Sequence, residues 1–152
     1  MKTIDLSKEM QALKDKHGSE YYRNTAFTKE AAALWGASPN EHGVLPAMKE
    51  AIVNIGLCLG EIRFHKTSKG HWLIGIDATS SYSGQSYLPT VHDTIGYESR
   101  ADARLAGVHK LIDFFEAVVK DTSSTNSEKN RADATKVLQR LNIEKNPQLG
   151  LF

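Results

Sequence analysis

The chain has little cysteine and no excess of charge of either sign. Its 152 residues contain one cysteine, Cys58, which excludes an intrachain disulfide framework and a cysteine-rich zinc site. Lys and Arg number 19 against 18 Asp and Glu, so the chain lacks the basic excess of a dedicated phosphate binder. Because the single cysteine is compatible with a reducing cytosol, we predict a cytoplasmic protein.

Long apolar runs and common enzyme motifs are also missing. No stretch approaches the roughly 20 apolar residues that span a bilayer, and the opening MKTIDLSKEM lacks the apolar core of a signal peptide. The sequence has no Gly-x-x-x-x-Gly-Lys, Gly-x-Gly-x-x-Gly, Gly-x-Ser-x-Gly or His-Glu-x-x-His motif. We therefore predict no membrane contact and no cofactor, and these absences favour a protein that is not an enzyme.

The N-terminal part of the sequence shows helical periodicity. Apolar residues recur at helical spacing over residues 5–16. A second helix is expected from Thr28, a capping residue, to Gly36. Pro46 suits the first turn of a third helix over residues 46–55.

Alternating apolar residues then predict three strands. The first covers residues 57–64 and changes phase at Gly60, which is typical of a bulge. The second covers residues 72–76 and forms a hairpin with the first. A third is expected over residues 86–94.

Helices return after these strands. Ser99 and Asp102 form a capping box, and an apolar stripe over residues 105–119 predicts a long helix. Residues 121–127 are polar and predict a linker, and a weaker helix is expected over residues 128–143.

Together these elements predict an α+β fold. A small three-stranded antiparallel sheet packs against helices in the central order α-β-β-β-α, with a helical N-terminal region and a helical C-terminal extension. Double-stranded-RNA-binding domains use this order, but so do many unrelated folds, so it indicates no activity. The expected regions are an N-terminal helical region (1–43), a core domain (44–120), a linker (121–127), a helix (128–143) and a flexible tail (144–152).

Histidines and acids around the predicted sheet are candidates for metal chemistry. His65 and His71 flank the predicted hairpin turn, and two histidines with a carboxylate suit a divalent metal. A metal-dependent nuclease or hydrolase therefore stays open beside an ordinary solvated surface. The candidate ligands are His65, His71, Asp77 and His92.

Basic side chains near the hairpin turn and the start of the long helix are candidates for a nucleic-acid patch. A local patch of this kind needs no overall basic excess. A nucleic-acid-binding module is therefore a further alternative, and the competing interpretation is again an ordinary solvated surface. The candidate residues are Arg63, Lys66, Lys69, Arg100 and Arg104.

The last five residues, Gln148-Leu149-Gly150-Leu151-Phe152, differ from the rest of the chain. They place large apolar side chains at a chain end, where order is unusual unless the end is tied down. Either these side chains pack on their own domain or they dock into a partner. Burying Leu151 and Phe152 would contribute roughly 3–6 kcal/mol, which after the ordering cost suits a micromolar tether.

This pentapeptide resembles the bacterial sliding-clamp-binding motif, whose usual form is Gln-Leu-(Ser or Asp)-Leu-Phe. Four of its residues fit, and Gly150 departs from the pattern. Polymerases, mismatch-repair proteins and many mobile-element proteins carry the motif in flexible segments. The resemblance implies that Gln148 makes polar contacts at the entrance of the clamp groove and that Leu151 and Phe152 fill its hydrophobic pocket.

The resemblance predicts a non-enzymatic accessory protein of bacterial or mobile-element DNA metabolism. Its partner would be the sliding clamp, the beta subunit of DNA polymerase III, and DNA is a candidate second partner. The metal-dependent enzyme and the nucleic-acid-binding module remain the alternatives. The predicted partner-binding residues are Gln148, Leu149, Leu151 and Phe152.

Overall fold

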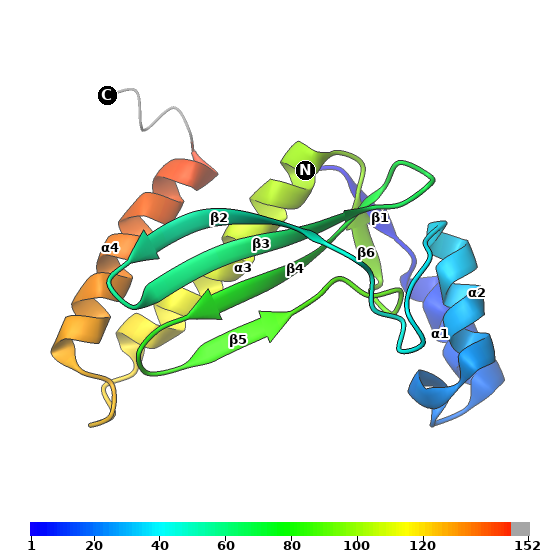
Figure 1. Cartoon of the computed structure of the whole chain (residues 1–152), viewed down its shortest axis with the longest axis horizontal. Coiled ribbons are helices and arrows are strands. Elements are labelled where there is room, and N and C mark those ends of the chain that lie inside the picture. Colours follow the sequence, from blue (N-terminus) through cyan, green and yellow to red (C-terminus); the bar gives the residue numbers. More distant parts are fainter. Residues whose placement is uncertain (147–152) are drawn as a thin grey trace. The chain divides into compact units, whose positions relative to one another are not determined.

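The computed structural model describes residues 1–146 and confirms the predicted α+β class. It contains four α-helices and a six-stranded antiparallel sheet with the strand order β1-β6-β4-β3-β2, in which β5 also pairs with β4 (Figure 1). The prediction of three strands is therefore wrong. The helices are α1 (Ser7–His17), α2 (Thr25–Trp35), α3 (Arg100–Lys120) and α4 (Glu128–Lys145), with a 3₁₀ turn at Tyr21–Arg23, and the strands are β1 (Thr3–Asp5), β2 (Met48–Ile55), β3 (Cys58–Lys66), β4 (Trp72–Thr79), β5 (Gly84–Tyr87) and β6 (Ile95–Tyr97).

The chain forms two compact units, each assembled from three segments that are distant in sequence. Each unit has its own fully buried apolar side chains, for example Trp35 in unit 1 and Leu141 in unit 2. Unit 1 consists of Met1–Met48, Phe64–Ile74 and Leu88–Ala103. Among the described residues, unit 2 consists of Lys49–Arg63, Gly75–Tyr87 and residues 104–146.

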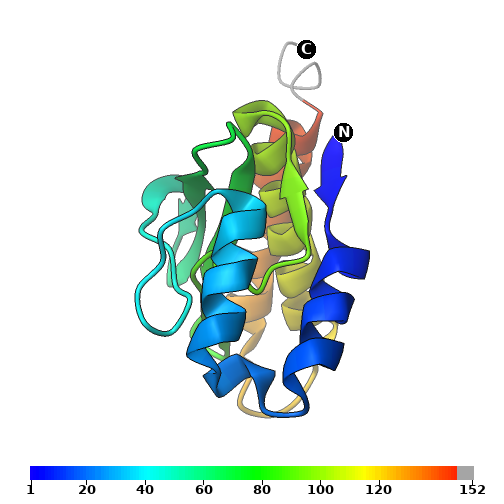
Figure 2. The ribbon, with the colours of Figure 1, turned by 90° about the vertical axis from the view of Figure 1, so that its right-hand side faces the viewer.

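In unit 1, α1 and α2 form an antiparallel helical hairpin (Figure 2). Phe27 and Trp35 are fully buried in a cluster with Leu73 of β4. Trp35 also lies against β6, where a Cβ added at Gly96 would approach its ring to 2.8 Å. Glycine at this position of β6 therefore lets the indole pack directly against the strand.

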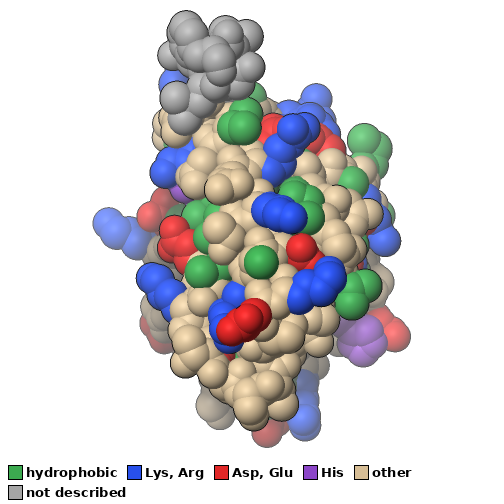
Figure 3. Space-filling model, turned by 90° about the vertical axis from the view of Figure 1, so that its left-hand side faces the viewer, with side chains coloured by type: hydrophobic (Ala, Val, Ile, Leu, Met, Phe, Trp, Pro, Cys, Tyr) green, Lys and Arg blue, Asp and Glu red, His purple; other side chains and the backbone are tan. Residues whose placement is uncertain are grey.

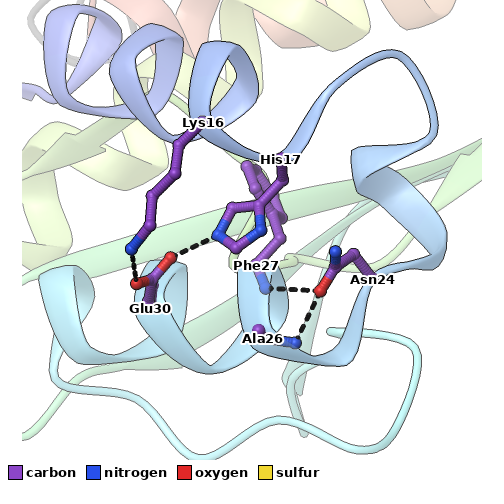
Figure 4. A network of polar contacts seen from close by, with 6 residues as sticks. All are labelled: Lys16, His17, Asn24, Ala26, Phe27 and Glu30. Carbon is purple, nitrogen blue, oxygen red and sulfur yellow. Dashed lines mark hydrogen bonds and ion pairs between the residues drawn. The ribbon is translucent and has the colours of Figure 1, made fainter.

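The first turn of α2 is capped by Asn24, so the predicted cap at Thr28 is wrong. The Asn24 side-chain oxygen accepts hydrogen bonds from the backbone amides of Ala26 at 2.8 Å and Phe27 at 3.2 Å (Figure 4). Asparagine is among the best residues at this position, whereas Thr28 lies inside the helix and is buried. The predicted end at Gly36 is confirmed, with a left-handed φ of 70°.

A polar network joins α1 to α2 in unit 1. Glu30 accepts from Lys16 Nζ at 2.5 Å and lies 2.5 Å from His17 Nε2 (Figure 4). The His17 ring also meets the Phe27 ring edge-on, with centroids 5.9 Å apart. Since Lys16 is exposed and Glu30 is partly exposed, the ion pair between them contributes little to stability.

The predicted helix over residues 46–55 is wrong, because this segment forms β2. Ile52 and Val53 are both buried in the strand. These β-branched residues favour strands, and pairing with β3 outweighs the helical spacing of the apolar residues.

The predicted bulge at Gly60 is also wrong, because β3 alternates without a break. Cys58 and Gly60 face inward, while Leu57 precedes the strand and is 73% exposed. A Cβ at Gly60 would lie 3.2 Å from a methyl group of Leu111 on α3. Glycine therefore gives the helix a close approach to the strand and causes no change of phase.

The predicted strand over residues 86–94 is wrong in its extent. β5 ends at Tyr87, β6 begins at Ile95, and a loop joins them. Backbone hydrogen bonds tie this loop to the earlier loop of unit 1, from Leu45 to the Pro89 carbonyl at 3.0 Å and from Val91 to the Gly43 carbonyl at 2.9 Å. Contacts between segments so far apart in the sequence cannot be predicted from the local pattern of apolar and polar residues.

The two C-terminal helices are confirmed, and they run in opposite directions (Figure 1). The Asp102 amide donates to Ser99 Oγ at 3.1 Å, as the capping box predicts. In the segment between the helices, Asn126 donates to the Val118 carbonyl at 2.8 Å and accepts from Asn130 of α4 at 2.8 Å. Residues 121–127 thus include a buried polar anchor.

Candidate nucleic-acid interface

An open groove of about 430 Å³ lies in unit 1, where the start of β2 meets the β3–β4 hairpin. We call it the Trp72 groove. It combines apolar, aromatic and basic side chains. Its lining consists of Pro46, Ala47, Met48, Phe64, His65, Lys66 and Trp72.

The hairpin places Lys66 and Trp72 on either side of a tight turn. The backbone amide of Thr67 donates to the His71 carbonyl at 2.8 Å, and the Thr67 hydroxyl accepts from the His71 amide at 3.1 Å. Gly70 has a φ of 80°, which favours glycine. The local sequence therefore sets the spacing of the two side chains.

Aromatic rings form part of this groove. Phe64 and Trp72 meet edge to face, with ring centroids 6.2 Å apart. Phe64 is buried, whereas Trp72 is half-buried and retains accessible ring surface. Met48 at the edge of the groove is 70% exposed. The groove thus offers a flat apolar surface to a planar ligand.

Two cations lie over these rings. Lys66 Nζ is 5.7 Å from the centroid of the Trp72 ring, and Arg100 Cζ is 4.4 Å from the centroid of the Phe64 ring. Both distances fall in the range of cation–π contacts. The lining residues include no Asp or Glu, so positive charge is not neutralised within the groove lining.

His65 positions one wall of the groove. Its Nδ1 donates to the carbonyl oxygen of Pro46 at 2.8 Å. Because a carbonyl only accepts, Nδ1 carries the proton of this bond. His65 therefore holds the segment before β2 against β3.

The other candidate metal ligands have separate roles. His92 stacks on Phe27, with centroids 5.4 Å apart and an interplanar angle of 6°, and its burial lowers its pKa. Asp77 pairs with Arg63 at 3.3 Å, while His71 contributes its backbone to the hairpin turn. Within residues 1–146, no group of three or more His, Cys, Asp or Glu side chains is placed to hold a metal ion. The described part of the chain gives the metal-dependent alternative no ligand set.

Among the five predicted nucleic-acid residues, Arg63, Arg104 and Lys69 make polar contacts within the protein. In unit 2, Arg63 bonds to Asp77 and Ser86. Arg104 bonds to Glu50 at 2.7 Å and to Glu144 at 3.0 Å. In unit 1, Lys69 donates to the Leu34 carbonyl at 2.8 Å. Of the five, Lys66 and Arg100 are the residues that meet the aromatic rings of the Trp72 groove.

A second groove, of about 360 Å³, lies in unit 2 and provides a comparison. We call it the Tyr87 groove. It is also lined by aromatic rings, those of Tyr87 and Phe114, but it contains Asp113 as well as Lys110. Elsewhere on unit 2, the face that includes α4 also intersperses acidic and basic side chains (Figure 3).

Trp72, Phe64 and Met48 are not among the binding residues predicted from the sequence. Trp72 and Phe64 alternate with other apolar residues, as core positions do, and the spacing around Met48 predicts a helix. The sequence feature that could have indicated a binding site is the placement of a tryptophan and a lysine on either side of a short turn. The predicted partner-binding residues Gln148, Leu149, Leu151 and Phe152 lie outside the described residues.

Comparison with family models, curated proteins and solved structures returns no match to this chain. The helices of residues 1–146 include none that combines the length and apolar character needed to cross a membrane.

Proposed function

We propose that this chain is a non-enzymatic accessory protein of bacterial or mobile-element DNA metabolism that is tethered to the replication sliding clamp. The tether is the pentapeptide of residues 148–152. The observation that carries the proposal is the sequence of this peptide, in which four residues match the clamp-binding motif and Gly150 departs from it.

The burial of the preceding residues supports a partner-binding role for the peptide. Leu141 is fully buried, but Ile143, the next apolar residue, is 38% exposed. Residues 142–146 contribute no buried side chain, although they belong to the end of α4 or follow it directly. The core of the described residues is therefore built from side chains up to Leu141, which favours docking of Leu151 and Phe152 on a partner.

The test is binding of the full chain to a purified bacterial sliding clamp, measured by calorimetry or surface plasmon resonance. We expect a dissociation constant of about micromolar order, because two buried apolar side chains less the ordering cost give that affinity. A double Leu151→Ala and Phe152→Ala variant should lose binding by more than about tenfold. Leu57→Ala, which changes a leucine that is 73% exposed, should bind as the unmodified chain does.

Restoring the usual motif provides a gain-of-function arm. Gly150→Ser should tighten binding about two- to fivefold, because replacing glycine restricts the unbound peptide by about 0.4–1 kcal/mol. Circular dichroism of each variant establishes that the fold persists. Absence of clamp binding by the folded full chain contradicts the proposal, and so does unfolding of the domain by the double variant, since the peptide would then be part of the core.

A further inference from the structure

The Trp72 groove has the two components that proteins use to bind single-stranded nucleic acid. The first is a stacking surface, provided by the accessible part of Trp72 beside the exposed Met48. Any nucleobase presents a flat ring to such a surface, so stacking tolerates many sequences. In a duplex the bases are already stacked on one another, so this surface favours an unpaired base.

The second component is positive charge beside the stacking surface. Lys66 Nζ lies 5.7 Å from the Trp72 ring, and Arg100 lies over the neighbouring Phe64. Lys66 makes no ion pair with any residue of the described part of the chain. Its ammonium group can therefore approach a phosphate without breaking an internal salt bridge.

Charge complementarity distinguishes this groove from the Tyr87 groove. Both contain aromatic rings and a lysine, but Asp113 brings a negative charge into the Tyr87 groove. The described lining of the Trp72 groove contains Lys66 and His65 and no carboxylate. A polyanion with planar groups therefore fits the Trp72 groove better than a neutral or cationic peptide.

We propose that the Trp72 groove binds single-stranded DNA, with an unpaired base stacked on Trp72 and an adjoining phosphate facing Lys66. The choice of DNA over RNA rests on the proposed clamp tether. The stacking groove itself is independent of the peptide at residues 148–152. The two proposals can therefore fail separately.

The test uses fluorescein-labelled oligo-dT of about 12 nucleotides, within the usual range of single-strand site sizes. Fluorescence anisotropy should show binding that weakens as salt rises, because phosphate contacts release counterions. Duplex DNA of the same length should bind more weakly. Equal binding of duplex and single strand would overturn the proposal, and an RNA oligonucleotide that binds more tightly than DNA would overturn the choice of DNA.

Intrinsic fluorescence reports on the groove directly. The chain has two tryptophans, of which Trp35 is fully buried. A base stacked on Trp72 should quench its emission, and a Trp72→Phe variant, which retains a ring, should lose that quenching while it keeps the signal of Trp35. Quenching that persists unchanged in Trp72→Phe would place the ligand elsewhere.

Two surface variants test the site without disturbing the core. Lys66→Glu and Met48→Glu, at exposed positions, should each weaken oligo-dT binding about tenfold or more, since each puts a carboxylate beside the bound phosphates. Lys110→Glu makes the same charge change in the Tyr87 groove and should leave affinity within about twofold. Equal losses in Lys66→Glu and Lys110→Glu would overturn the assignment to this groove.

A variant that lacks residues 148–152 separates this proposal from the clamp tether. It should lose clamp binding and keep its affinity for oligo-dT. If the shortened chain loses its affinity for oligo-dT by more than about tenfold, the peptide and not the Trp72 groove binds the DNA, and the proposal is overturned.

Discussion

The Trp72 groove of unit 1 and the Tyr87 groove of unit 2 are similar in size and differ in charge. Their volumes are about 430 Å³ and about 360 Å³, and each combines aromatic rings with a lysine. Asp113 accompanies Lys110 in the Tyr87 groove, while the described lining of the Trp72 groove has no carboxylate. A carboxylate competes with a ligand phosphate for the ammonium group. The presence or absence of acidic side chains in a groove therefore indicates more about anion binding than the number of basic side chains does.

The basic side chains repeat this contrast. Arg104 of unit 2 joins Glu50 to Glu144, so its charge is used within the protein. Lys66 of unit 1 makes no ion pair among residues 1–146, and its ammonium group lies 5.7 Å from the centroid of the Trp72 ring. A ring contact leaves the positive charge in place, while an ion pair offsets it.

The largest effect on stability is expected from removing the buried side chain of Asn130 in unit 2, which bonds to Asn126. Asn130 is 4% exposed, and its side chain accepts from the Ser81 amide at 3.2 Å and donates to Asn126 at 2.8 Å. Asn130→Ala should lower the free energy of unfolding by about 2–3 kcal/mol, because buried partners lose their hydrogen bonds. Urea unfolding measures the change.

A matched asparagine on the same helix controls for this variant. Asn142 is exposed on α4, so Asn142→Ala should change the free energy of unfolding by less than about 0.5 kcal/mol. Oligo-dT binding of folded Asn130→Ala should be unchanged, since the Trp72 groove belongs to unit 1. Similar stability losses in the two variants would mean that the buried anchor contributes little.

A smaller loss is expected when an internal arginine is removed. Arg104→Ala should cost about 1–2 kcal/mol of unfolding free energy, because the ion pairs that Arg104 makes with two partly buried carboxylates are lost. Its oligo-dT affinity should stay the same, because Arg104 belongs to unit 2 and the Trp72 groove belongs to unit 1. Denaturation and fluorescence anisotropy of this variant measure the two quantities, and a loss of DNA affinity as large as that of Lys66→Glu would contradict the assignment of the site to the Trp72 groove.

The helices could be predicted from the sequence far better than the strands. The stripe that forms α3 and the capping box at Ser99 are local signals, and the structure confirms both. β2 was assigned to a helix because its apolar residues fit helical spacing, and pairing with β3 decided otherwise. β1 and β6 contain three residues each, too few to show a period, and they pair with each other across more than half of the chain.

The candidate site was predictable in part. The β3–β4 hairpin and the start of α3, where Lys66 and Arg100 lie, can be predicted from the sequence, but the sequence does not show that Arg63 and Arg104 meet carboxylates. These partners are 14 and 54 positions away. Trp72 has the pattern of a core residue, and only its partial exposure in the structure distinguishes it from Trp35.

Removing Lys66 should affect binding and leave stability almost unchanged. Lys66→Ala should change the unfolding free energy by less than about 0.5 kcal/mol, because the side chain is exposed and forms no ion pair among residues 1–146. The slope of log affinity against log salt for oligo-dT should fall by about 0.7, the value for one phosphate contact on a single strand. Lys110→Ala should not change that slope, and a change of the same size there would contradict the contrast between the two grooves.

The smallest effects concern pH, where the two units should respond in different ranges. In unit 1, burial lowers the pKa of His92 below its usual 6.5. The unfolded chain therefore protonates His92 more readily than the folded chain does. The contribution of neutral His92 to the free energy of unfolding is fully present above about pH 6.5 and decreases as the pH falls below that value. In unit 2, hydrogen bonds from Ser123 and Tyr82 lower the pKa of Asp121 to about 2. The contribution of the ionised Asp121 carboxylate to the free energy of unfolding is therefore present above about pH 4 and is lost as the pH falls toward 2.

Two substitutions assign these ranges to their residues. His92→Phe keeps a ring to stack on Phe27 and removes the titrating group, so the decline between about pH 7 and 5 should become shallower than in the unmodified chain. Asp121→Asn should leave that range unchanged and flatten the decline between about pH 4 and 2. Chemical denaturation at a series of pH values measures both. Identical curves for His92→Phe and the unmodified chain would mean that the partly buried imidazole titrates as it does in the unfolded state, and the acid response of unit 1 would then have to come from its other titratable groups.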